Sequence, residues 1–105
     1  MSVIGRRLKE ARLRAGLSQE RLGLEAGLEP ESASARMNRY ETGNRVPDLE
    51  LMERIGSVLG VPAAYFYASN DQVAELLVAF SALSPKVRDK ALELVKTAGQ
   101  RAKTP

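Results

Sequence analysis

The sequence contains no cysteine and no histidine among its 105 residues. It can therefore form no disulfide and offers no thiolate or imidazole ligand to a metal ion, and we expect no cofactor. Long apolar runs are also lacking: the longest near the end, LLVAF at 76–80, is far too short to cross a bilayer. Arg6 and Arg7 come too early to leave room for the apolar stretch of a signal peptide. These absences predict a cytoplasmic protein with no membrane partner.

The overall composition is that of a folded protein. Apolar residues make up 44% of the chain and charged residues 28%, far from the composition of a disordered segment. A chain of this length buries one core, so we expect one compact domain with a small appendage. The formal net charge of +3 favours an acidic partner only weakly. Whether the protein binds such a partner must therefore be judged from where the arginines lie.

Helix signals follow one another from the N-terminus to residue 67. Each predicted helix combines helical apolar spacing with a cap or a breaker at its ends. No segment alternates apolar and polar residues with β-branched enrichment, so the predicted fold class is all-α. The first three predicted helices span residues 3–15, closed by Gly16, then Gln19 to about Ala26, capped by Ser18, and then Ser32 to Gly43. A fourth helix follows Asp48 and ends at Gly60, and a short fifth helix runs from Pro62 through Phe66. The inward residues of the fourth helix are Leu51, Ile55, Val58 and Leu59.

A second part of the chain begins where the composition changes at 68–70. Two helical apolar stripes follow, separated by Ser84 and Pro85, which supply an N-cap and a first-turn proline. Such a hairpin has too little core to be stable alone, so it needs the first five helices or a second copy of the chain. We therefore divide the chain into 1–69 and a C-terminal helical hairpin, 70–105, for dimerisation or packing. The stripes are Val73, Leu76, Leu77, Phe80 and Leu83, and Val87, Ala91, Leu94, Val95 and Ala98.

The third predicted helix, in the stretch SASARMNRYETG, has an apolar face and an opposite polar face. At 100° per residue, Ala33, Met37 and Tyr40 share one side, and Arg39 lies on the other. Arginine can donate two parallel hydrogen bonds to guanine and asparagine can pair with adenine, so these residue types suit base readout in a major groove. A solvated surface is the alternative explanation for Arg39. The candidate base contacts are Arg39, Asn38, Arg36, Ala35 and Ser34.

The stretches GRRLKEARLRAGLSQERLGLEAG and RMNRYETGNRVPDLELMERIGSVLGVP resemble the Cro/repressor-type helix-turn-helix family, also called XRE-like. The resemblance covers roughly residues 4–67 and includes GLSQ, the Tyr-Glu-x-Gly block and the proline-led fourth helix. It implies a five-helix repressor-like DNA-binding domain in which the third helix enters the major groove of double-stranded DNA.

The resemblance also implies phosphate contacts outside the third helix. Gln19 matches the family glutamine that holds a phosphate, and the N-terminus of a helix is favourable for an anion. Ser18 caps the same helix and is a second phosphate candidate. Asn44 and Arg45 lie on a loop that runs along the DNA backbone in relatives; an unpartnered surface charge is the alternative for Arg45.

Arg12 and Glu41 match a pair that forms a partly buried salt bridge in the family, between the first helix and the end of the third. The resemblance therefore assigns Glu41 to structure, because a carboxylate that faced DNA would be repelled by phosphate. Removing either partner would leave the other charge unpaired, at a cost of about 3 to 5 kcal/mol.

Three positions depart from the family pattern. Arg21 stands where a glutamate usually completes a capping box with Ser18. Gly23 replaces a usual alanine at a close helix crossing, which keeps the room but costs about 1 kcal/mol of helix propensity. The stretch from Gly27 to Tyr40 is four residues longer than usual. Either the third helix gains about one turn at its N-terminal end, or the loop through LEPES is enlarged.

The sequence as a whole predicts a sequence-specific DNA-binding transcriptional regulator. We expect a homodimeric repressor that reads a palindromic operator with half-sites about one helical turn apart, near 34 Å, and that pairs through the C-terminal hairpin or through residues 65–67. The alternative is an antitoxin-like or scaffold module that keeps the fold and binds a protein partner instead. We do not expect an enzyme, because a general base would have to be a carboxylate such as Asp71 or Glu75, which charged surface explains better.

Overall fold

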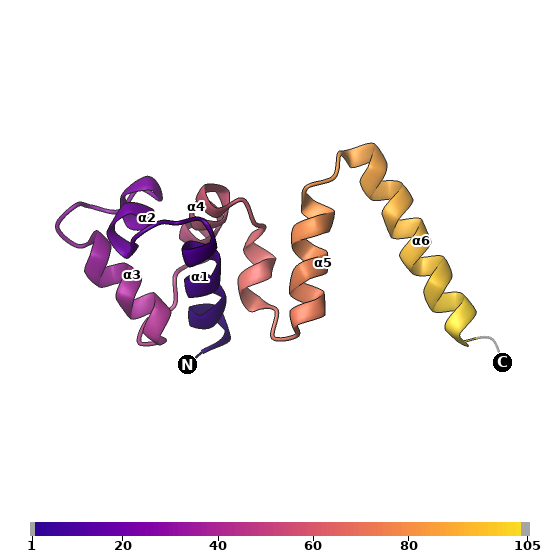
Figure 1. Cartoon of the computed structure of the whole chain (residues 1–105), viewed down its shortest axis with the longest axis horizontal. Coiled ribbons are helices and arrows are strands. Elements are labelled where there is room, and N and C mark those ends of the chain that lie inside the picture. Colours follow the sequence, from indigo (N-terminus) through magenta and orange to yellow (C-terminus); the bar gives the residue numbers. More distant parts are fainter. Residues whose placement is uncertain (1, 104–105) are drawn as a thin grey trace.

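The computed structural model describes residues 2–103, which form seven helical elements and no strand. The first five elements pack into one body, α5 lies beside η1, and α6 extends away from the body (Figure 1). The all-α fold class predicted from the sequence is confirmed. In chain order the elements are α1 (Val3–Arg14), α2 (Gln19–Glu25), α3 (Ala33–Thr42), α4 (Leu49–Leu59), the 3-10 helix η1 (Ala63–Tyr67), α5 (Asp71–Ser81) and α6 (Pro85–Lys103).

Side-chain caps and glycines set most helix ends where the sequence predicted them. The side chain of Ser18 accepts a hydrogen bond from the backbone N–H of Arg21 at 3.0 Å, and that of Asp48 accepts one from Leu51 at 2.8 Å. Gly43 ends α3 with a φ of 85°, in the left-handed region that glycine adopts without a steric penalty. Within the described residues no helix is both long and apolar enough to cross a membrane.

The core of the body is made by the inward faces of α1 to α4 and by η1. On α4 the predicted inward face is confirmed: Leu51 and Ile55 are buried, and Val58 and Leu59 are half-buried against the core. Met52 is also fully buried, which the sequence analysis did not predict. The missing side chain of Gly56 leaves room for the backbone after α4, because a Cβ there would lie 2.5 Å from the carbonyl oxygen of Val61. The largest fully buried side chains are Phe66, Leu8, Leu22, Met37, Met52 and Ile55.

The four extra residues before α3 enlarge the loop and do not extend the helix. The predicted helix start at Ser32 is one residue early, since α3 begins at Ala33 and residues 30–32 form a turn. The backbone N–H groups of Ser32 and Ala33 both donate to the carbonyl of Glu29, at 3.0 and 2.9 Å. Leu28 is 7% exposed and anchors this loop in the core.

Arg7 joins α5 to the body, a role that the sequence analysis did not assign to it. Its side chain is 5% exposed and donates from Nε to the carbonyl of Ala68 at 2.8 Å and from Nη2 to Asp71 at 2.8 Å. The guanidinium also lies over the ring of Tyr65, 5.7 Å from its centroid. The connection between η1 and α5 is therefore fixed against α1.

The predicted apolar stripe of α5 is not the face that docks on the body. Ala74, outside that stripe, is 2% exposed and belongs to the core, whereas Val73 and Leu76 are 48% and 51% exposed. The small side chain of Ala74 allows α5 to approach η1 closely. The helix therefore has a second apolar face that points away from the body.

We expect Gly23→Ala to lower the free energy of unfolding by about 1 to 3 kcal/mol, measured by urea denaturation. A Cβ at Gly23 would lie 2.9 Å from Cβ of Ala33 and 3.0 Å from its carbonyl oxygen, so α3 would have to shift. This cost outweighs the gain of about 1 kcal/mol in helix propensity. Gly99→Ala in α6 is the matched control, because nothing lies within 4 Å of its Cβ position, and it should not destabilise. Equal effects of the two changes would contradict the close approach.

The Arg7–Asp71 pair should make stability depend on pH. The hydrogen bond from Arg7, and then its positive charge, lower the pKa of Asp71 below the usual aspartate value. A lowered pKa in the folded state stabilises above the unfolded pKa of about 3.9, and this contribution is lost as the pH falls through the folded pKa. Asp71→Asn should therefore be slightly less stable than the parent chain at neutral pH, with the difference vanishing once the pH falls below the lowered pKa of Asp71 in the folded state. Urea denaturation over this pH range measures it, and a pH-independent difference would refute the assignment.

Candidate nucleic-acid interface

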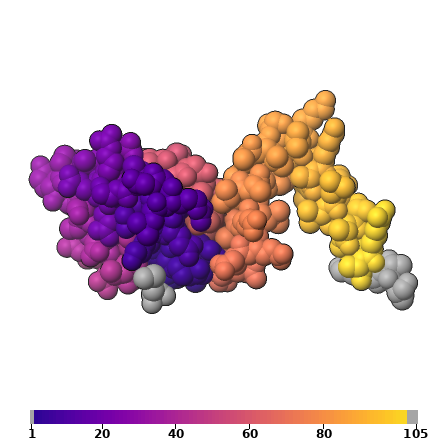
Figure 2. All heavy atoms as spheres, viewed as in Figure 1, coloured from indigo at the N-terminus to yellow at the C-terminus, as the bar shows by residue number. Residues whose placement is uncertain are grey.

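Helix α3 lies at the end of the molecule opposite α6 (Figures 1 and 2). Ala33 and Met37 are fully buried and Tyr40 is 6% exposed, so the predicted inward face is confirmed. The opposite face is open to solvent. Its exposed members are Ser34, Ala35, Asn38 and Arg39.

A buried ion pair holds the C-terminal end of α3 against α1. Arg12 approaches Glu41 with two nitrogens, at 2.5 Å from Nε to Oε2 and 3.1 Å from Nη2 to Oε1. Its third nitrogen, Nη1, donates to the carbonyl of Leu17 at 2.9 Å. Side-chain exposure is 10% for Arg12 and 4% for Glu41, so both charges are withdrawn from solvent. The acidic residue of α3 is thus neutralised inside the protein.

Gln19 connects the start of α2 to this pair and to the outer face of α3. Its side-chain Nε2 donates to Oε1 of Glu41 at 3.2 Å and to Oδ1 of Asn38 at 3.3 Å. The side-chain NH2 of Asn38 donates to no group within residues 2–103. Asn38 is therefore oriented through its oxygen and keeps two donors for an external acceptor.

Three arginines line one side of α3. Arg39 and Arg45 are exposed, and their guanidinium groups have no partner among the described residues. Arg36 is half-buried instead: it donates to the hydroxyl of Tyr40 at 2.8 Å and lies over that ring. The three guanidiniums border a hollow of about 300 Å³ together with Tyr40 and Val46. This side of α3 is strongly basic.

The turn after α3 folds back on the end of the helix. The backbone N–H groups of Asn44 and Arg45 both donate to the carbonyl of Arg39, at 3.0 and 3.3 Å. These bonds keep Asn44 and Arg45 next to the basic side of α3, where both side chains are exposed.

A second hollow, of about 700 Å³, lies between the start of α2 and the start of α3. It brings Ser34 together with Ser18 and Gln19, which are the two predicted phosphate contacts on α2. Arg21 also lines it, although the sequence analysis considered this residue only as the loss of a capping box. The replacement of an acidic by a basic residue at a helix N-terminus was the signal that could have identified it.

The carboxylates considered for catalysis are not arranged as an active site. Asp71 is bonded to Arg7, which lowers its pKa and makes it a poorer base. Glu75 is exposed, beside a hollow between α1 and α5. No group of three or more metal-ligating side chains occurs within residues 2–103.

Helices α2 and α3, joined by a loop and backed by α1 and α4, form a helix-turn-helix. Residues 3–65 match the family described as Helix-turn-helix domain, so the chain belongs to that family. This confirms the assignment that the Cro/repressor-type resemblance indicated.

A solved structure, that of the transcriptional regulator BswR, shares 42% sequence identity with this chain at a TM-score of 0.77. The similarity covers 89% of this chain and 92% of the other, so it extends beyond the family match into the C-terminal hairpin. Comparison with curated proteins gives no match.

We expect Arg12→Met and Glu41→Gln each to lower the free energy of unfolding by about 3 to 5 kcal/mol, because each leaves a buried group unpaired. The double variant should lose less free energy of unfolding than the sum of the two single losses, since no lone buried charge remains in it. Urea denaturation of the four proteins measures this coupling. Additive losses would show that the pair does not act as a unit.

Proposed function

We propose that this protein is a sequence-specific double-stranded DNA-binding transcriptional regulator with α3 in the major groove. Membership of the helix-turn-helix family and the likeness to a transcriptional regulator support this class. The observation that carries the proposal is the free guanidinium of Arg39 on an exposed helix face whose acidic residue is neutralised internally. A bidentate contact to guanine requires such a group.

The candidate base contacts on α3 differ in whether their side-chain donors are already used within the protein. Arg39 and Asn38 have unused donors and are assigned to base edges, with Ala35 and Ser34 beside them. Arg36 is the third base candidate, and its bond to Tyr40 would have to be shared with a base or exchanged for it.

Phosphate contacts are assigned to both ends of the α2–α3 unit. Ser18 and Gln19 stand at the N-terminus of α2, and Asn44 and Arg45 stand just after α3. These contacts position the protein on DNA without reading sequence.

We further propose that two copies act as a repressor on a palindromic operator in the cytoplasm. Half-sites about 34 Å apart, or a multiple of this spacing, would match a two-fold dimer. We assign residues 1–69 to DNA binding and 70–105 to dimerisation. Burial of Tyr65 and Phe66 leaves only Tyr67 of that aromatic trio exposed, which favours the hairpin over η1 as the dimer surface.

Selection of a random duplex DNA pool on the purified protein, at near-physiological salt, tests the proposal. Enrichment of a palindrome is the expected result. A flat pool bound only at low salt would show backbone binding alone, and no binding at all would favour the protein-interaction module.

Arg39→Ala should weaken binding to the selected DNA by about 1 to 3 kcal/mol and relax the preference at one base position. Arg45→Ala, the matched control, should weaken selected and random DNA alike and reduce the salt dependence by about one released counterion. Binding titrations at several salt concentrations separate the two effects. If Arg39→Ala affected selected and random DNA equally, Arg39 would not read a base.

A further inference from the structure

We propose that the C-terminal hairpin pairs with the hairpin of a second copy, so that α6 of one chain covers the open apolar stripe of α5 in the other. This deepens the dimer of the proposed function, but its test does not use DNA.

The exposed apolar residues of the molecule are concentrated in the hairpin. Of the ten large hydrophobic side chains that are exposed within residues 2–103, six lie on α5 and α6. A concentration of this kind marks an interaction surface rather than ordinary solvent-facing sequence. The six are Val73, Leu76, Val87, Leu92, Leu94 and Val95.

The outward face of α5 carries no charge. Opposite the docked Ala74, the helical positions are occupied by uncharged residues only. The charged residues of α5 are Asp71, on the docked side, and Glu75, at one edge of the outward face; both line a hollow with α1 residues. An exposed helix face without a charge is typical of a face that is covered. The outward positions are Gln72, Val73, Leu76, Ala79 and Phe80.

Helix α6 cannot cover this face within its own chain. Arg88 donates to the carbonyls of Phe80 and Ser81, at 3.4 and 2.6 Å, which fixes the start of α6 next to the end of α5. From there the two helices diverge (Figure 1), and every residue from Leu92 to Ala102 is exposed. The hairpin is therefore open, with one apolar stripe on each arm.

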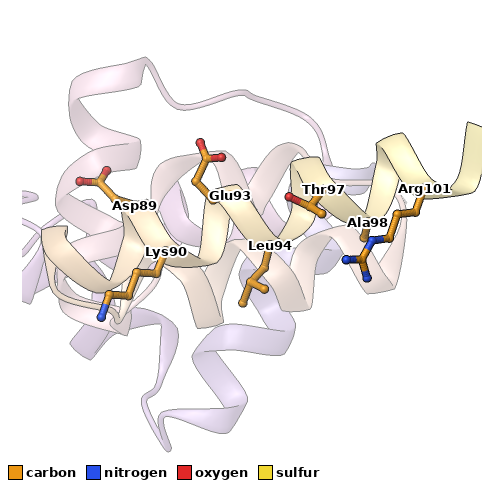
Figure 3. Close-up of a pocket in the computed structure, with 7 residues that line it drawn as sticks. All are labelled: Asp89, Lys90, Glu93, Leu94, Thr97, Ala98 and Arg101. Carbon is orange, nitrogen blue, oxygen red and sulfur yellow. The ribbon is translucent and has the colours of Figure 1, made fainter.

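A hollow of about 930 Å³ runs along α6, and all seven residues that line it belong to α6 (Figure 3). It has no opposite wall, so it is an open helix face and not a ligand cavity. Leu94 and Ala98 contribute its apolar part, and the polar and charged residues around them are Asp89, Lys90, Glu93, Thr97 and Arg101. With 19 residues and about 28 Å of length, α6 is long enough to lie along all of α5 in a second copy.

Charge complementarity identifies the second copy as the occupant. Glu75 on α5 and Lys90 and Arg101 on α6 have no ion-pair partner among residues 2–103. Both charged residues of α5 are acidic, whereas α6 carries six basic and two acidic residues. One chain therefore presents an apolar stripe on an acidic helix and another on a net basic helix, and two copies can satisfy each other.

The first test is the molar mass of the full chain by light scattering over a concentration series, for the parent and two variants. Val95→Asp places a charge in the stripe of α6 and should shift the protein to monomer. Lys96→Asp places an acidic residue on the other side of α6, outside the residues that line the hollow, and should remain dimeric. A monomeric parent chain, or a dimer that both variants preserve, would overturn the proposal. So would binding of anionic lipid vesicles by a monomeric parent chain.

The second test uses the absence of cysteine from the sequence. Leu76→Cys and Leu94→Cys chains, tagged differently and mixed under mild oxidation, should form a disulfide between the two kinds of chain. This readout does not depend on a destabilising substitution. A mixture that gives no mixed disulfide would exclude the packing of α6 on α5 of the partner. Neither test involves DNA. If the DNA selection enriched no sequence, the two tests would still show whether the hairpins of two copies pair.

Discussion

The buried ion pair between Arg12 and Glu41 is the constraint on which the presentation of α3 depends. It lies where two backbones touch, because a Cβ on Gly5 of α1 would overlap the carbonyl oxygen of Glu41. A bidentate pair in such a place has little freedom to reorient, and a lone partner would carry a large desolvation cost. At the other end of α3, the contact between Gly23 and Ala33 sets the distance from α2. The two contacts fix α3 at both ends.

This arrangement also determines the charge that the outer face of α3 presents. Glu41, the acidic residue of the helix, is turned inward and neutralised, so arginines and an amide are left outside. Gln19 connects the buried ion pair to the outer face of α3, since its amide nitrogen donates both to the buried carboxylate of Glu41 and to the exposed Asn38. A change in the buried pair would therefore reach the outer face through a single side chain. Gln19 is therefore the link between the buried ion pair and the exposed face of α3.

The sequence was sufficient wherever the determinants were local. Caps at Ser18 and Asp48 and the apolar face of α3 depend on residues a few positions apart, and all were predicted. Arg7 was not recognised, because its partners lie more than 60 residues away and a single arginine in an amphipathic helix resembles a solvated charge. The face of α5 that docks on the body was not identified for a related reason. Both of its faces are apolar, and only contact with η1 selects the one with the smaller side chain.

In the proposed dimer, the Arg7 contacts would also make the hairpin set the distance between the two DNA-binding bodies. Since Arg7 binds both the backbone before α5 and Asp71 at its start, α5 moves with α1 as one unit. The two-fold axis of a hairpin-mediated dimer therefore fixes the separation of the two α3 helices, with no flexible linker to absorb a mismatch. Hairpins stacked side by side would place the bodies next to each other and suit half-sites one turn apart. Hairpins joined end to end would place the two α3 helices at opposite ends of the dimer. Such a dimer would require half-sites separated by several helical turns of DNA. In the proposed dimer, the half-site spacing of the operator would report how the α5 and α6 stripes pair.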